Sequence, residues 1–296
     1  MGGIVGQMDF CSQANSISDC VNNGDVYASS GAVGGILGSY GILSLNITEE
    51  TCACFTIDGC VNYGNVANGD GILGTGGILG LSATMTDSTD ELLITECINY
   101  GEISAKTAGH VGGILGSSEK ALSGGVTKIA SCANSGNILF GDGQGVYKTP
   151  DEILAVAEED EEDSAETVAS NKTILMVGSS ALGGIVGHSR LCIVSDCANI
   201  GKIYYSSESS AFSGGICGMY LYIPDTDTYT IETSSLTACV STNEVEAAYG
   251  LAYDWGEETI SDVTLVSPEQ AQSAFEAIES LIVVAEYGSV SGNDQE

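Results

Sequence analysis

The sequence predicts an all-β fold: a parallel β-helix (a solenoid, with right-handed winding favoured) that carries a helical insert and a C-terminal capping helix. A motif with cysteine, asparagine and glycine at fixed positions returns every 35 to 42 residues, and such a period indicates a solenoid, a propeller or an array of modules. The 40 glycines exclude helical repeats, because each glycine costs about 1 kcal/mol inside a helix. Short β-branched and apolar segments between Gly, Asn and Ser clusters are typical of strands and tight turns. The usual signatures of propeller blades are missing, so the parallel β-helix is favoured.

The motif reads C-x-N-x-G-x-[IV] in five copies, and a sixth copy is degraded. Its cysteines are Cys20, Cys60, Cys97, Cys132, Cys197 and, in the degraded copy, Cys239. If each repeat forms one coil of two or three short strands, equivalent residues stack about 4.8 Å apart. We therefore expect the cysteines to form one buried column, in which cysteine serves as a small apolar filler and most thiols are reduced.

The motif asparagines are expected to form a second column, at a bend of the chain. They are Asn22, Asn62, Asn99, Asn134 and Asn199. Each side-chain amide can donate to the same side chain one coil away, which satisfies polar groups in a buried position. The motif glycine is expected to turn the corner in a left-handed conformation. In the degraded copy Asn243 replaces it, and asparagine tolerates that conformation best after glycine.

A second block, G-G-I-x-G, accompanies the copies. It starts at Gly2, Gly34, Gly76, Gly112, Gly183 and Gly214. Together the two blocks resemble the GLUG motif family, over about residues 1–250 outside the insert. The resemblance implies a repeat region of a large secreted or wall-attached bacterial protein, and hence an extracellular or cell-wall location. Such repeats also accompany immunoglobulin A-cleaving metallopeptidases, outside their catalytic domain. Those enzymes need H-E-x-x-H, and neither His110 nor His188 is followed by that pattern, so the peptidase activity is not implied.

The period nearly doubles between Cys132 and Cys197, which predicts an acidic, partly helical insert at about 140–180. Thr149, Pro150 and Glu152 are typical of a helix start, so a helix is expected at about 150–158. It runs into the acidic residues 158–163. We favour a solvated loop over a calcium site there, because calcium ligands usually alternate with spacers and a glycine.

The chain is expected to consist of a repeat region at 1–250 and a cap or linker at 251–296. A helix at about 268–283 is predicted from the start signal of Ser267, Pro268 and Gln270, followed by apolar residues at helical spacing. A helix over the last coil would cover the open strand edge, which otherwise invites aggregation. A linker to a following domain is the alternative, and the degraded sixth copy favours the cap.

The formal net charge of −33 argues against nucleic-acid partners and anionic membrane surfaces, because like charges repel. No apolar run approaches the length of a membrane span, and no signal peptide is recognisable at the start. The chain starts inside a recurring motif. We therefore expect a segment of a longer protein, whose uncapped N-terminal coil is open to end-to-end contacts.

We assign no catalytic, cofactor-binding or metal-binding residues from the sequence. Cys52-x-Cys54 followed by Cys60 lacks the second C-x-x-C pair and the histidines that zinc sites usually have. The two histidines of the chain both lie beside glycine turns. Arg190 is the single arginine, whereas β-helix enzymes that cleave acidic polysaccharides need several cations to hold substrate carboxylates.

The predicted function is that of a non-enzymatic extracellular module of a bacterial surface protein, acting as a stalk or a multivalent binding surface. Its expected partners are surface proteins or glycans of a host or a neighbouring cell. Two alternatives stay open: a β-helix polysaccharide lyase or hydrolase that uses converging carboxylates, and a calcium-dependent surface scaffold.

Overall fold

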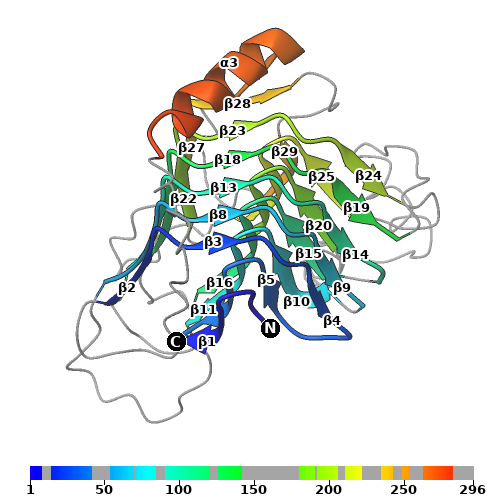
Figure 1. Cartoon of the computed structure of the whole chain (residues 1–296). Coiled ribbons are helices and arrows are strands. Elements are labelled where there is room, and N and C mark those ends of the chain that lie inside the picture. The colour runs from blue at the N-terminus through cyan, green and yellow to red at the C-terminus, as the bar shows by residue number, and fades with distance from the viewer. Residues whose placement is uncertain are drawn as a thin grey trace, which may run out of the picture.

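A computed structural model describes residues 1–8, 15–41, 54–69, 71–84, 91–107, 109–120, 126–141, 180–190, 192–205, 211–221, 235–242, 249–253 and 263–282 of the chain. Its strands pair in parallel and form five sheets that run along one stack (Figure 1). The predicted all-β parallel β-helix is confirmed. Each full coil contributes five short strands, one to each sheet, whereas two or three were expected. The coil bends at glycines and also at the residue before each motif cysteine, which leaves pieces of two to six residues.

We name the sheets C, D, E, A and B, in the order in which one coil passes through them. Sheet C holds β2 (Asn15–Ser18), β7 (Phe55–Asp58), β12 (Leu92–Thr95), β17 (Thr127–Ala130), β22 (Cys192–Ser195) and β27 (Ser235–Thr237). Sheet D holds β3 (Val21–Asn22), β8 (Val61–Asn62), β13 (Ile98–Asn99), β18 (Ala133–Asn134), β23 (Ala198–Asn199), β28 (Cys239–Thr242) and β30 (Val263–Val266). Sheet E holds β4 (Val26–Ala28), β9 (Val66–Asn68), β14 (Ile103–Ala105), β19 (Ile138–Phe140) and β24 (Ile203–Tyr205).

The last two sheets carry the G-G-I-x-G block at their junction. Sheet A holds β5 (Val33–Gly34), β10 (Gly71–Gly76), β15 (Gly109–Gly112), β20 (Ser180–Gly183) and β25 (Ala211–Gly214). Sheet B holds β1 (Val5–Met8), β6 (Leu37–Tyr40), β11 (Leu79–Thr84), β16 (Leu115–Lys120), β21 (Val186–Arg190), β26 (Cys217–Leu221) and β29 (Tyr249–Tyr253).

The lengthened period adds no coil to the stack, because β18 pairs directly with β23. The expected insert helix at about 150–158 and the acidic run at 158–163 lie outside the described residues. Parallel pairing continues beyond residue 250, where β30 pairs with β28 in sheet D. Val263 stands at the position of a motif cysteine there, and Leu265 at that of a motif asparagine. The strand pairing therefore continues in register although these two residues differ from the motif.

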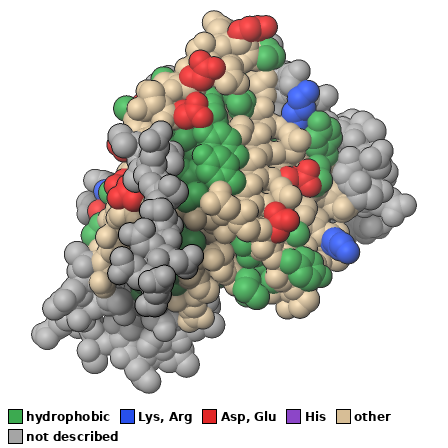
Figure 2. All heavy atoms as spheres, viewed as in Figure 1, with side chains coloured by type: hydrophobic (Ala, Val, Ile, Leu, Met, Phe, Trp, Pro, Cys, Tyr) green, Lys and Arg blue, Asp and Glu red, His purple; other side chains and the backbone are tan. Residues whose placement is uncertain are grey.

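The predicted C-terminal helix is α3 (Pro268–Glu279), and it begins with the expected capping box between Ser267 and Gln270. Phe275 and Ile278 pack on the outer side chains of sheet D, including Ile98 and Ala198. The helix therefore covers the flank of sheet D near the end of the stack, whereas we expected it over the open strand edge. Figure 2 shows hydrophobic side chains gathered beside it on this face. Among the described residues, no helix has the length and apolarity to cross a membrane.

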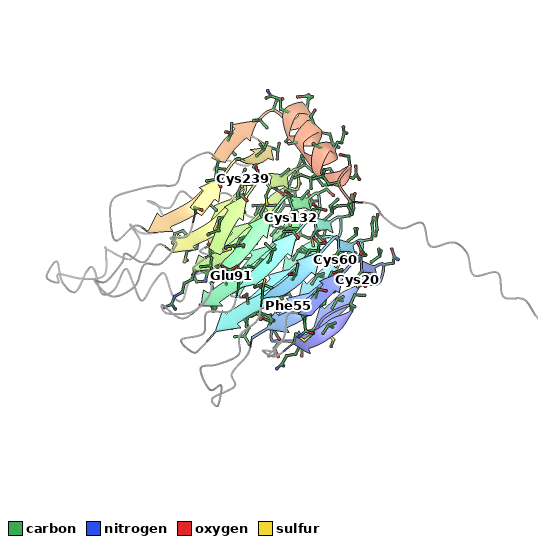
Figure 3. The ribbon with its side chains drawn as sticks, turned by 90° about the vertical axis from the view of Figure 1, so that its left-hand side faces the viewer. Cys20, Phe55, Cys60, Glu91, Cys132 and Cys239 are labelled. Carbon is green, nitrogen blue, oxygen red and sulfur yellow. The ribbon has the colours of Figure 1, made fainter. Side chains whose placement is uncertain are left out.

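The motif cysteines form the predicted column inside the stack, buried from Cys60 to Cys239, whereas Cys20 in the first coil is only partly buried (Figure 3). The residues that follow them pair in register, as Val61 does with Ile98. Each buried thiol contacts backbone carbonyls. The Sγ of Cys97, for example, donates to the oxygen of Thr95 at 3.1 Å and lies 3.7 Å from that of Ile57 in the preceding coil. No disulfide joins the nine described cysteines to one another; Cys11 and Cys52 lie outside the described residues.

The asparagine column is also confirmed. Each Nδ2 donates to the Oδ1 of the next coil, at 2.7 Å from Asn22 to Asn62 and from Asn62 to Asn99, 2.8 Å from Asn99 to Asn134 and 2.9 Å from Asn134 to Asn199. The same Nδ2 donates to the carbonyl of the motif glycine two residues on, as Asn99 does to Gly101 at 2.7 Å. Asn199 ends the series on the hydroxyl of Ser241 at 3.3 Å. These buried amides are thus satisfied without water.

The motif glycine has a different role from the one we expected. The left-handed conformation belongs to the residue before the cysteine, for example Asp19, Glu96 and Ser131, with φ between 50° and 52°. The motif glycines do not share it. A Cβ atom on Gly101 would lie 1.9 Å from the carbonyl oxygen of Gly64 in the neighbouring coil. Glycine is therefore needed because adjacent coils touch backbone to backbone at this point.

The interior holds two apolar clusters, one between sheets B, C and D and one between sheets A and E. Cys60 belongs to the first cluster and Val66 to the second, and Asn62 lies between them along the chain. On the opposite wall, Gly35 faces this amide so closely that an added Cβ would be 2.4 Å from Cγ of Asn62. The asparagine column and the second glycine of G-G-I-x-G therefore meet across the coil, which explains why the two blocks recur together.

We predict that the thiols of Cys97, Cys132 and Cys197 escape alkylation in the native protein, while the exposed thiol of Cys54 reacts. Burial raises the pKa of the three column thiols, so the reactive thiolate is scarce. Modification then requires unfolding, which slows it at least about a thousandfold. Mass spectrometry after labelling with one reagent in buffer and a second in denaturant measures this. Equal labelling of Cys97 and Cys54 in buffer would contradict it.

Candidate functional site

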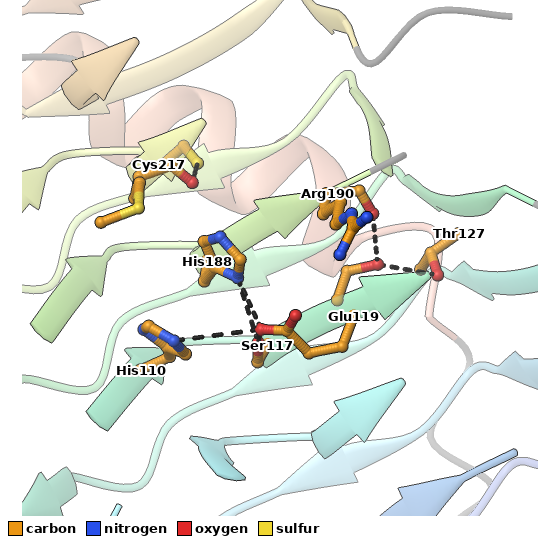
Figure 4. A network of polar contacts seen from close by, with 9 residues as sticks. His110, Ser117, Glu119, Thr127, His188, Arg190 and Cys217 are labelled. Carbon is orange, nitrogen blue, oxygen red and sulfur yellow. Dashed lines mark hydrogen bonds and ion pairs between the residues drawn. The ribbon is translucent and has the colours of Figure 1, made fainter. Parts of the chain in front are cut away.

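The fold brings together the two histidines of the chain and one carboxylate. His110 lies on β15, Glu119 on β16 of the same coil, and His188 on β21 of the next coil (Figure 4). In sheet B, Ser117 pairs with His188 and Glu119 with Arg190. The three residues therefore meet where sheets A and B of two consecutive coils adjoin.

Alternation along the strands places these side chains on the outer faces of sheets A and B. Val111 belongs to the interior cluster, so its neighbour His110 points to the other face of sheet A. Ser118 points inward, where its hydroxyl donates to Thr127 at 3.3 Å, so Ser117 and Glu119 lie on the outer face of sheet B. A Cβ on Gly116 would meet the backbone nitrogen of Thr75 at 2.3 Å, so the two sheets adjoin closely and their outer side chains touch.

The carboxylate of Glu119 is the centre of the cluster. Its Oε1 lies 2.8 Å from Nδ1 of His188 and accepts a hydrogen bond from the hydroxyl of Ser117 at 2.7 Å. Nε2 of His110 is 4.0 Å from the same oxygen. The two imidazole rings stack with their centroids 4.6 Å apart and their planes inclined by 26°.

The electrostatics of the cluster favour a neutral His110 beside an ionised Glu119. Burial, with the nearby His188 as a second cause, lowers the pKa of His110 to about 3. Burial alone would raise the pKa of Glu119, but the hydrogen bonds of His188 and Ser117 lower it to about 2. At neutral pH the site thus offers an imidazole lone pair next to a negative carboxylate.

The hydrogen bonds of the cluster are incomplete. Among the described residues, neither the buried Nδ1 of His110 nor Nε of Arg190, beside the cluster, has a hydrogen-bond partner. A buried polar atom in this state costs about 1–3 kcal/mol. One donor atom each from His110, Glu119 and His188 lies within 4.8 Å of the others, so two nitrogens and one oxygen could hold a metal ion.

Sequence reasoning did not anticipate this cluster, because 78 residues separate His110 from His188 and no local spacing links them. The position of each histidine within its repeat could have revealed the cluster. His110 precedes its G-G-I block by two residues, and His188 follows the next block directly. Of the three cysteines considered for a zinc site, Cys54 is exposed and Cys60 belongs to the buried column. Cys52 and the acidic residues 158–163 lie outside the described residues.

Comparison with known proteins supports the fold but does not identify a function. No protein-family model and no curated protein matches the chain. The chain is similar to a crystal structure described as a "putative immunoglobulin A1 protease" from Bacteroides ovatus, with a TM-score of 0.50 and 17% identity. The match covers 93% of this chain and 69% of that one. At this identity the likeness is one of fold alone.

Proposed function

We propose that the chain is a non-enzymatic structural or adhesion module of a bacterial surface protein, located outside the cell or in the cell wall. The asparagine column is the observation that carries the proposal. Its repeated amides are fully engaged within the stack, and the repeated glycines and cysteines serve contacts between coils. The repeated residues thus serve the stacking of coils, as is typical of repeat proteins that present extended surfaces.

The flank of the described stack is wide enough for a binding surface. The seven strands of sheet D span about 29 Å at about 4.8 Å per step.

The face formed by sheets D and E offers exposed aromatic rings. Tyr63 is 45% exposed and stacks on Tyr100 at a centroid distance of 4.8 Å, and Tyr27 and Tyr204 lie exposed on sheet E. The exposed acids Asp25 and Glu102 directly precede β4 and β14, and they lie two residues from Tyr27 and Tyr100, respectively. Tyrosine rings combine apolar area with a hydroxyl group, so the face suits surface glycans or cationic proteins of a host or neighbouring cell.

We expect binding to a glycan array or to cationic surface proteins, no turnover of glycans or proteins, and at least about tenfold weaker binding by Tyr63→Ser. The Ser104→Ala variant, which changes a half-buried residue of sheet E, serves as the matched control. Binding measured by surface plasmon resonance and product analysis by mass spectrometry test these outcomes. Turnover of a glycan that a single Asp or Glu substitution abolishes would overturn the proposal in favour of a polysaccharide-active enzyme.

A further inference from the structure

We propose that His110, Glu119 and His188 form a binding site for one divalent transition metal ion of the zinc class. In tetrahedral zinc sites the bonds measure about 2.0–2.2 Å, which places neighbouring donor atoms about 3.4 Å apart. Here Oε1 of Glu119 is 2.8 Å from Nδ1 of His188 and 4.0 Å from Nε2 of His110. These separations lie on either side of the required value, so small side-chain rotations bring all three donors to one ion.

A purely structural role explains the cluster less well. A buried histidine that only fills space normally satisfies both ring nitrogens. Within the described part of the chain, however, Nδ1 of His110 has no partner, and its Nε2 is too far from Glu119 for a hydrogen bond. Equivalent outer positions in other coils hold apolar as well as small polar residues: Met219 pairs with His188 in sheet B, Ala32 packs against Leu81, and Ser39 pairs with Leu81. The repeat thus accommodates apolar residues here and does not itself require two histidines and a carboxylate.

The donor set selects the class of ion. Two imidazoles and one carboxylate suit zinc and its neighbours in the transition series, whereas Ca²⁺ and Mg²⁺ prefer oxygen donors alone. The Glu119 side chain is 39% exposed, which leaves a path for the ion and room for water as a further ligand. The hydroxyl of Ser117 holds Oε1 of Glu119 at 2.7 Å and so orients the carboxylate.

Binding would join β16 of one coil to β21 of the next, and the chain between these two strands includes the long segment 142–179. His110 and Glu119 precede this segment and His188 follows it. An ion held by both coils binds the folded chain and not the unfolded one, so it raises the melting temperature with increasing metal concentration. The site therefore adds a metal-dependent link at the place where the repeat is interrupted.

The test uses the full chain, stripped with a chelator and alkylated in native buffer to block accessible thiols. Titration with Zn²⁺ in excess Ca²⁺, followed by calorimetry, excludes sites made of carboxylates alone. We expect one Zn²⁺ per chain and a higher melting temperature. With Co²⁺ we expect visible absorption bands of a low-coordinate ion without the near-ultraviolet band of a thiolate ligand.

Two substitutions make the test specific to the three residues. His110→Ala and Glu119→Gln should each weaken Zn²⁺ binding at least about tenfold to a hundredfold, while circular dichroism in the absence of metal stays that of the parent. Glu102→Gln, the same change at an exposed acid, should bind as the parent does. Absence of saturable 1:1 binding, or unchanged affinity in Glu119→Gln, would overturn the proposal. Because Glu119→Gln preserves side-chain shape, it remains informative even if His110→Ala fails to fold.

Discussion

Gly77→Ala is expected to prevent stable folding, with a loss of about 4 kcal/mol or more in the free energy of unfolding. The added Cβ would lie 2.2 Å from the carbonyl oxygen of Gly113 and 2.4 Å from Cγ of Asn99. The first of these atoms belongs to the backbone of the adjacent coil, so no side-chain rotation relieves the overlap. The coils themselves would have to separate, which breaks the parallel pairing on either side. Denaturant titration followed by circular dichroism, together with the yield of soluble protein, measures the effect.

Gly6→Ala is the matched control, because a Cβ on Gly6 meets no atom within 4 Å. This substitution should change the free energy of unfolding by no more than about 0.5 kcal/mol. A similar loss in both variants would mean that glycine serves this chain through backbone conformation and not through space between coils.

The columns were predictable from sequence because a fixed period and parallel pairing permit a single alignment of equivalent residues. The register of Asn62, Asn99 and Asn134 follows from counting alone. The number and length of the strands could not be predicted from the sequence, because a short apolar segment can bend at any glycine. The C-terminal helix was predictable from the start signal at Ser267, but its docking site on sheet D depended on outer side chains that the motif does not constrain.

The role of the motif glycine was misjudged for a physical reason. A glycine can be required by a positive φ or by lack of space for a Cβ, and one sequence does not distinguish the two causes. The residues that do adopt the left-handed conformation are chemically diverse, including Glu96, Ser131 and Ala238, so no residue type marks the position. Each bears a cost of about 1 kcal/mol or more that the surrounding coil must offset.

The His110–Glu119–His188 cluster was beyond local sequence reasoning for a related cause. Its members come from two coils and three strands, and they meet only after sheets A and B have come together at Gly116. Repeat motifs describe what is the same in every coil. A site that occurs once depends on positions that the motif leaves free.

Asn99→Ala is expected to lower the free energy of unfolding by about 3–5 kcal/mol, and the melting temperature by roughly 10 °C. The substitution leaves three buried groups short of one hydrogen bond each: the second N–H of Asn62, whose first N–H still donates to Gly64, Oδ1 of Asn134 and the carbonyl of Gly101. Each costs about 1–3 kcal/mol when it is left unsatisfied in a dry interior, and partial relaxation keeps the total near the lower part of the sum. Thermal unfolding monitored by circular dichroism measures the change.

The position of the asparagine within the column decides how large this effect is. Asn22 begins the column, and its Oδ1 accepts only from the backbone of Gly24, so Asn22→Ala leaves fewer buried groups unpaired. We expect it to cost about 1–2 kcal/mol, and the exposed Asn65→Ala less than about 1 kcal/mol. Equal losses at Asn22 and Asn99 would contradict a ladder whose inner members each serve two neighbours. A graded loss from Asn65 through Asn22 to Asn99 is the result expected if stacked amides, and not the asparagine backbone, hold the coils in register.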